Sequence, residues 1–154
     1  MFIDPRGPRF AAALTTVVLA AVLLTGSVWL LAAQTAVFAV GAFAGLHRSP
    51  YSALFRNFVR PRLAPPVDLE PVDPPRFAQA VGFGFGLVGT VALALDATTV
   101  GLIAVGMALG AAFLNAAFGF CLGCEIYLLA RRLLPARAIA VSPASTTTPE
   151  EITA

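Results

Sequence analysis

Four long stretches without a charged residue constrain this chain more than any other feature. Residues 10–24, 28–46, 77–95 and 100–124 contain no Asp, Glu, Lys or Arg. A helix of about 20 apolar residues is long enough to cross the hydrocarbon core of a bilayer. The chain is 58% hydrophobic and has a mean hydropathy of +0.86, a balance that a soluble domain of this length could not hide from water. The sequence therefore predicts an all-α membrane protein with four transmembrane helices.

Short polar turns divide these stretches into two hairpins. Residues 25–27, "TGS", separate the first stretch from the second, and residues 96–99 separate the third from the fourth. A single helix across either pair would be far longer than a bilayer needs. The sequence therefore favours two hairpins over two very long helices.

A rival interpretation treats residues 1–33 as a cleaved secretory signal. Arg6 and Arg9 could form the basic start of such a signal, and "LAAQTA" resembles a cleavage site. However, the apolar stretch continues past this site, and three spans would break the pattern of the arginines. Four spans remain the preferred prediction.

All ten basic residues are arginines, and they fall on one side of the predicted spans. They precede the first span, lie between the second and third, and follow the fourth: Arg6, Arg9, Arg48, Arg56, Arg60, Arg62, Arg76, Arg131, Arg132 and Arg137. Neither hairpin turn contains one. By the positive-inside rule, the amino terminus, the central loop and the carboxyl tail are expected in the cytoplasm.

The chain also contains a duplicated unit. "DPRGPRFA" at residues 4–11 recurs as "DPPRFA" at residues 73–78, each time directly before the first span of a hairpin. Two helices per unit bring both copies into the membrane in the same direction. The sequence predicts parallel repeats at residues 4–62 and 73–134, which together form the membrane domain 1–134. Chance similarity between short apolar strings is the alternative.

Glycines are spaced as helix-packing residues within three of the spans. The pairs Gly41 with Gly45 and Gly106 with Gly110 are four residues apart, and the third span contains a series, Gly82, Gly86 and Gly89. Small residues let helix backbones approach closely in lipid. We expect these positions at helix contacts.

The central loop, residues 48–76, divides into two parts. Residues 49–63 combine aromatic and leucine side chains near helical spacing with arginines, which predicts a short helix on the cytoplasmic membrane surface. Residues 64–75 are proline-rich and acidic, as in an extended connector. The tail, residues 135–154, has nothing to bury and is predicted to be disordered.

Cys121 and Cys124 are the only cysteines, and Glu125 follows them. At this spacing the sulfurs can reach one another at a helix start or in a turn. A nearby positive charge would raise the thiolate fraction, but Arg131 and Arg132 could supply it only if the chain folds back. Glu125 disfavours a thiolate unless it accepts a proton from the second thiol. Cys121, Cys124 and Glu125 are the candidate catalytic residues, near the cytoplasmic membrane boundary.

Two other roles remain open for these residues. Buried cysteine often serves as a small apolar residue without any chemistry. Alternatively, His47 could join Cys121, Cys124 and Glu125 in a tetrahedral set whose ligand types suit zinc or a softer ion. The chain lacks the second close-spaced pair of a strong zinc pattern. Metal is therefore the less favoured choice, and no cofactor is predicted.

The polar residues Gln34, Gln79 and Asn115 lie inside the spans, where interhelical hydrogen bonds explain them most simply. Asn115 could also orient the thiol region. No ionisable residue lies near mid-membrane, which weighs against a proton- or ion-coupled transporter. No phosphate loop, catalytic triad or paired-carboxylate arrangement is present, and no nucleic-acid partner is expected.

The chain resembles a family of small bacterial integral membrane proteins catalogued as "domain of unknown function 4395". The resemblance covers residues 3–132, and its most specific parts are "SPY" at residues 49–51 and "CLGCE" at residues 121–125. It implies a fold of membrane helices in the bacterial cytoplasmic (inner) membrane and no assigned activity. Members often have thioredoxin-like and sulfurtransferase genes as neighbours, an association that favours sulfur chemistry.

Three functions remain as hypotheses, and whether the chain is an enzyme is left open. The preferred one is a thiol-redox or sulfur-relay role, in which the cysteines form a disulfide or carry a persulfide and Glu125 assists proton transfer. Tyr127 and Asn115 would shape the site, and a thioredoxin-like protein or sulfurtransferase would be the partner. The second is a non-catalytic scaffold that binds a partner through the arginine-rich loop. The third is a small transporter of a sulfur compound, working as a homodimer.

Overall fold

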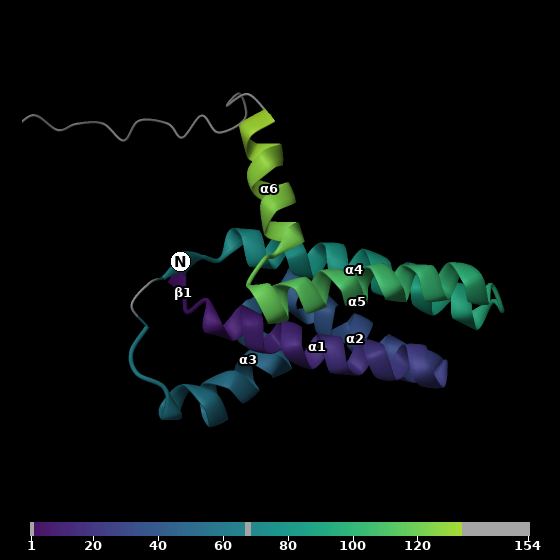
Figure 1. The fold of residues 1–154 in the computed structure, drawn as a ribbon, viewed down its shortest axis with the longest axis horizontal. Coiled ribbons are helices and arrows are strands. Elements are labelled where there is room, and N and C mark those ends of the chain that lie inside the picture. Colours follow the sequence, from purple (N-terminus) through teal and green to yellow (C-terminus); the bar gives the residue numbers. More distant parts are fainter. Residues whose placement is uncertain (1, 67–68, 134–154) are drawn as a thin grey trace, which may run out of the picture.

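Helices make up nearly all of the fold. The structure is a computed structural model that describes residues 2–66 and 69–133. Four helices run lengthwise side by side: α1 (Arg6–Thr25), α2 (Val28–Ala39), α4 (Asp73–Ala94) and α5 (Thr98–Phe118) (Figure 1). Within the described residues, α1, α4 and α5 are long and apolar enough to cross a membrane, and Val28–Ala44 is a shorter apolar helix. The all-α class is therefore confirmed, with three helices that could span a membrane.

The predicted hairpin turns are both present. α1 ends at Gly26, whose backbone adopts the left-handed conformation with φ 65°, a conformation that glycine reaches without strain. The Ser27 side chain then accepts a hydrogen bond from the Leu30 N–H and caps α2. Asp96, with φ 60°, makes the corresponding bend between α4 and α5. Both turns lie at the same end of the bundle (Figure 1).

At its other end, α2 continues as a π-helical turn, η1 (Val40–Ala44), and a short 3-10 turn, η2 (Leu46–Arg48). Arg76 of α4 covers this end: its Nε donates to the Ala42 carbonyl (2.7 Å) and its Nη2 to the Phe43 carbonyl (3.2 Å). Carbonyls at a helix end lack partners within the helix. Arg76, which belongs to the Pro-Arg-Phe motif repeated at residues 8–10 and 75–77, supplies those partners.

The central loop is helical where the sequence predicts a helix. Its elements are α3 (Pro50–Leu54), η3 (Phe55–Val59) and η4 (Arg60–Arg62). The connector after them includes β2 (Glu70–Pro71), which pairs antiparallel with β1 (Phe2–Ile3). This two-residue pairing was not predicted. It holds the start of the chain beside the start of α4.

The fourth apolar stretch is not a single helix, because the helix that it forms ends before the cysteines. α5 ends at Phe118, because Gly119 takes the left-handed conformation with φ 71°. The N–H of Gly119 donates to the Asn115 carbonyl and the N–H of Phe120 to the Leu114 carbonyl, an arrangement that closes a helix. A separate helix, α6 (Leu122–Leu133), then leaves the bundle steeply across its axis (Figure 1). The predicted disordered tail, residues 135–154, lies outside the described residues.

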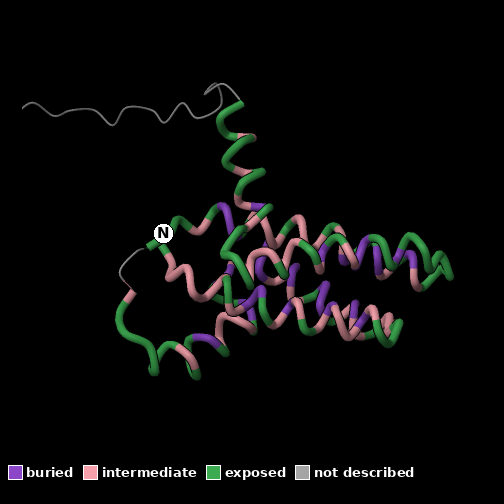
Figure 2. Tube along the Cα trace, viewed as in Figure 1, coloured by how far each residue is buried: buried purple, intermediate pink, exposed green. Residues whose placement is uncertain are grey.

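The tightly packed part of the bundle lies toward the hairpin turns. α1 packs along α5, α2 packs along α4, and α4 packs along α5. One cluster of buried side chains there consists of Leu19, Val22, Leu31, Val105 and Ala108. The outer faces are exposed (Figure 2), and they include apolar side chains such as Trp29 at 86% and Val17 at 68% exposure. Such a surface is stable against lipid and not against water.

Glycine contacts hold α4 close to α2. A Cβ atom added to Gly86 would lie 2.5 Å from Thr35 Oγ1, and one added to Gly82 would lie 2.9 Å from Phe38 Cε1. The glycines predicted on the third span are therefore confirmed at a helix contact. The prediction for Gly106 and Gly110 is wrong, since an added Cβ would meet no atom within 4 Å at either position.

Replacing Gly86 with leucine should force α4 and α2 apart. Gly84 is the matched control, because it lies two residues away on α4 and an added Cβ there meets nothing within 4 Å. We expect Gly86→Leu to lower the free energy of unfolding by about 1–3 kcal/mol, the usual cost of overpacking. Gly84→Leu should change it little. Unfolding in mixed micelles, followed by circular dichroism, measures both; equal losses would contradict the close contact.

Candidate functional site

Cys121 lies in the turn before α6, and Cys124 lies in the first turn of that helix. The Cys121 carbonyl accepts a hydrogen bond from the Glu125 N–H (3.0 Å), so Cys121 caps the helix. Its Sγ also accepts a hydrogen bond from the Cys124 N–H at 3.4 Å. The two sulfur atoms lie at bonding distance as a disulfide, with Cα atoms 5.2 Å apart. The pair is therefore at a helix start, one of the two placements in which the sulfurs were expected to meet.

Gly123, between the cysteines, brings this turn against the bundle. A Cβ added at Gly123 would lie 2.7 Å from both Cα and Cβ of Ala78 on α4. Because a backbone atom cannot move aside cheaply, any side chain at position 123 would push α6 off α4. The glycine of "CLGC" thus fixes where the cysteines lie.

A cation beside this turn comes from α1 and was not predicted from the sequence. A Cβ added at Gly119 would lie 3.5 Å from Arg9 Cζ, so the Arg9 guanidinium packs against the end of α5, two residues before Cys121. Arg131, which was considered instead, lies with its Cζ 5.9 Å from the centre of the Tyr127 ring, further along α6. The repeated Pro-Arg-Phe motif was the available signal, because it contains Arg9.

The other predicted site residues are distributed around the turn. Glu125 is exposed on α6. The Tyr127 ring packs on Phe77 of α4, with ring centres 5.7 Å apart. His47 lies against Gly45 in the other hairpin, with ring atoms 3.1–3.2 Å from an added Cβ.

The described part of the chain contains no group of three or more His, Cys, Asp or Glu residues close enough to hold a metal ion. The structure therefore does not bring His47, Cys121, Cys124 and Glu125 together as a ligand set.

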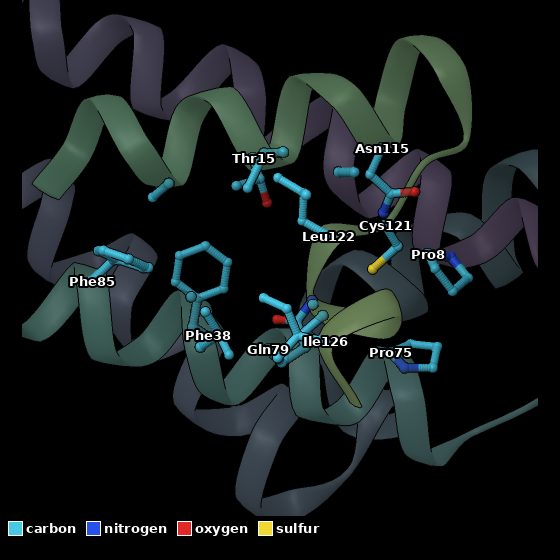
Figure 3. Close-up of a pocket in the computed structure, with 18 of the residues that line it drawn as sticks. Pro8, Thr15, Phe38, Pro75, Gln79, Phe85, Asn115, Cys121, Leu122 and Ile126 are labelled. Carbon is cyan, nitrogen blue, oxygen red and sulfur yellow. The ribbon is translucent and has the colours of Figure 1, made fainter. Parts of the chain in front are cut away.

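A cavity of about 270 Å³ lies inside the bundle next to Cys121. Its walls come mainly from α1, α4, α5 and the start of α6, and most are small or apolar: Pro8, Ala12, Phe38, Pro75, Ala78, Val81, Gly82, Phe85, Met107, Ala108, Ala111, Ala112, Leu122, Gly123 and Ile126. The polar lining residues are Thr15, Gln79 and Asn115. Figure 3 shows Cys121 and Asn115 toward one end of this cavity and Phe85 toward the other.

A buried polar chain connects the cavity wall to the central loop. Gln34 is 1% exposed, and its Nε2 donates to Thr15 Oγ1 (3.3 Å). The Tyr51 hydroxyl donates to Gln34 Oε1. Burial raises the pKa of Tyr51, which keeps its hydroxyl protonated and able to donate. The interhelical hydrogen bond expected for Gln34 is therefore present, and Tyr51 of the "SPY" motif is its unforeseen second partner.

Residues 3–132 match the model of the family described as Domain of unknown function (DUF4395), and the chain therefore belongs to this family. The resemblance inferred from the motifs is thus confirmed over the same residues. No curated protein and no solved structure matches the chain.

Neutralising Arg9 should slow the chemistry of Cys121. In a Cys124→Ser background, we expect Arg9→Gln to reduce the rate of Cys121 alkylation by iodoacetamide at neutral pH about threefold, because the thiolate loses a neighbouring positive charge. Arg6→Gln is the matched control, since Arg6 lies on the same turn of α1 but donates to the Ala64 carbonyl. Equal alkylation rates in the two variants would contradict a role for Arg9.

Proposed function

We propose that this DUF4395 family member is a thiol-redox or sulfur-relay protein in which Cys121 and Cys124 cycle between dithiol and disulfide at the cytoplasmic face of the bacterial inner membrane. One observation carries the proposal: the pair lies at the start of α6, with the Cys124 N–H donating to Cys121 Sγ. N–H groups at a helix start stabilise a thiolate formed there. A packing cysteine needs no such arrangement.

The two cysteines have different roles in this proposal. A thiolate on Cys121 would be stabilised by the start of α6 and by Arg9 beside Gly119. A stabilised thiolate leaves faster, so the thiolate of a partner dithiol attacks Cys124 Sγ and Cys121 leaves. The second thiol of the partner then resolves the mixed disulfide. Glu125, exposed beside Cys124, accepts a proton from an incoming thiol.

The partner in this reaction is a thioredoxin-like protein or a sulfurtransferase. The site borders both a surface that a protein can reach, where Glu125 is exposed, and the interior of the bundle, where Cys121 lines the cavity. The dithiol of a protein partner reacts with the pair on the first side.

We propose that the bundle consists of four spans built from two parallel repeats. Phe10 of the first Pro-Arg-Phe motif packs on Phe55, with ring centres 5.8 Å apart and planes at 45°. Phe77 of the second motif packs on Tyr127 at 5.7 Å and 45°. The arginines cross between the repeats: Arg76 bonds the end of η1, and Arg9 packs at the end of α5. Matching contacts from matching motifs support a duplication over chance similarity.

The proposed orientation puts the cysteine end of the bundle in the cytoplasm. The described arginines belong to segments at this end, and the hairpin turns at the other end contain none. The turns η3 and η4 and the helix α6 would lie along the cytoplasmic surface, where their arginines reach lipid phosphates.

If the pair is a working redox pair, its midpoint potential should lie between about −270 and −120 mV, the range of thiol-exchange proteins. A structural disulfide would lie below about −300 mV. Purified protein equilibrated in glutathione and dithiothreitol buffers, followed by maleimide gel shift, measures this value. Cys121→Ser and Cys124→Ser identify the unshifted bands. A potential in the structural range would leave the scaffold role as the better explanation.

The orientation can be measured by cysteine labelling in intact cells. In a Cys121→Ser, Cys124→Ser background, Thr99→Cys at the start of α5 should react with a membrane-impermeant maleimide from outside. Asn57→Cys in η3 should react only after the membrane is permeabilised. The reverse pattern would place the cysteine pair outside the cytoplasm.

A further inference from the structure

We propose that the cavity beside Cys121 binds the ring of a membrane quinone, which accepts the electrons of the reduced Cys121–Cys124 pair. This inference rests on the proposed redox function and names the oxidant that would return the dithiol to the disulfide. Cys121 lines the cavity, and its sulfur points into the space between α4 and α5 (Figure 3). An electron acceptor in the cavity would therefore lie against a reacting atom.

The size and lining of the cavity suit a single ring system. Its volume of about 270 Å³ is near the lower limit of small-molecule sites, about 300 Å³. Phe38 and Phe85 contribute aromatic rings to the lining, and the remaining walls are mostly alanine, glycine and aliphatic side chains. An uncharged flat ring can enter such a space, whereas an ion would lose its hydration without a counter-charge.

Two amides in the lining can bind the oxygens of a quinone. Gln79 and Asn115 line the cavity from α4 and α5. Within the described residues, neither amide group makes a side-chain hydrogen bond, whereas Gln34 is bonded to both Thr15 and Tyr51. The two amides lie on different helices. The Gln79 side chain also packs against Gly41 of η1, where an added Cβ would lie 2.9 Å from Gln79 Oε1. The NH2 groups of Gln79 and Asn115 can each donate to one carbonyl oxygen of a ring between them.

A second feature provides room for the tail of such a molecule. A groove of about 440 Å³ lies between α4 and α5 and is lined by Gly84, Val88, Val100, Ile103 and Ala104 in addition to Val81, Phe85 and Met107. Val81, Phe85 and Met107 also line the cavity. The apolar groove and the cavity therefore adjoin. An isoprenoid tail can lie in the groove while the ring occupies the cavity, which favours a lipid-soluble quinone over a water-soluble oxidant.

The proposed step balances without another reactant. The S–H bonds of Cys121 and Cys124 break and one S–S bond forms between them. The two electrons enter the quinone ring, and the two protons end on its two oxygens, which gives the quinol. A phospholipid could fill the same space but has no group that accepts electrons.

The experiment uses the reduced full-length protein in phosphatidylcholine nanodiscs and decylubiquinone as the probe. This quinone has no unsubstituted ring carbon for a thiol to add to. We expect loss of the quinone absorbance together with loss of both free thiols, and a protein mass reduced by two hydrogens. In a parallel reaction, glutathione disulfide oxidises the protein from the aqueous side. This reaction tests the redox pair without the quinone cavity.

Ala111→Phe fills the cavity from α5, and Ala117→Phe is the matched control on the same helix, outside the cavity lining. We expect Ala111→Phe to slow oxidation by decylubiquinone at least about tenfold, as for 1.4 kcal/mol of lost binding. Oxidation of the same variant by glutathione disulfide should continue at the wild-type rate, which shows that the redox pair itself is intact. Gln79→Leu provides a milder change and should raise the quinone concentration needed for half-maximal rate.

The outcomes separate the two proposals. Oxidation by glutathione disulfide but not by decylubiquinone would overturn the quinone site and leave the redox function in place. Failure with both oxidants would overturn both. Equal quinone rates in the wild type, Ala111→Phe and Gln79→Leu would show a reaction outside the cavity and would also overturn the site. Quinone binding without loss of thiols would reduce the cavity to a lipid-binding space.

Discussion

The ends of the helices depend on one constraint: in a bilayer, every backbone carbonyl and N–H needs a partner within the protein. The chain can therefore turn or break only where such partners exist. Arg76 supplies them for the carbonyls of Ala42 and Phe43, and Gly119 ends α5 by turning its own N–H back to Asn115. Because α5 ends there, the cysteines lie in a turn and at a helix start, and do not lie along a membrane helix.

The two ends of the bundle are packed differently. Near the hairpin turns, Leu19, Val22, Leu31 and Val105 fill the centre. Near the cysteines, small residues line the interior and leave a cavity. Helix packing there relies on contacts around the cavity, such as Phe38 against Gly82 and Gln34 with Thr15, and the cavity lies between them. Its position beside Cys121 makes a functional reason for it the stronger explanation.

In the proposed function, the cysteine pair would serve two environments at once. Cys121 borders the apolar interior, and the neighbouring Glu125 is exposed at the end of the bundle. A redox protein with this arrangement can take electrons from a water-soluble partner and pass them into the membrane. A scaffold would need neither the cavity nor the hydrogen bond from the Cys124 N–H to Cys121 Sγ. No feature of the described residues favours the transporter hypothesis over the redox proposal.

The sequence by itself determined the all-α membrane class, the hairpin turns, the helix in the central loop and the cysteine pair, because hydropathy, turn residues and spacing act locally along the chain. Only the tertiary structure decided that α5 stops at Gly119, that Arg9 lies beside this turn and that Gly123 docks on Ala78. It also decided that Gly106 and Gly110 face open space. These features depend on which helices become neighbours, and a pattern of apolar residues does not encode that choice when all sides of a helix are apolar.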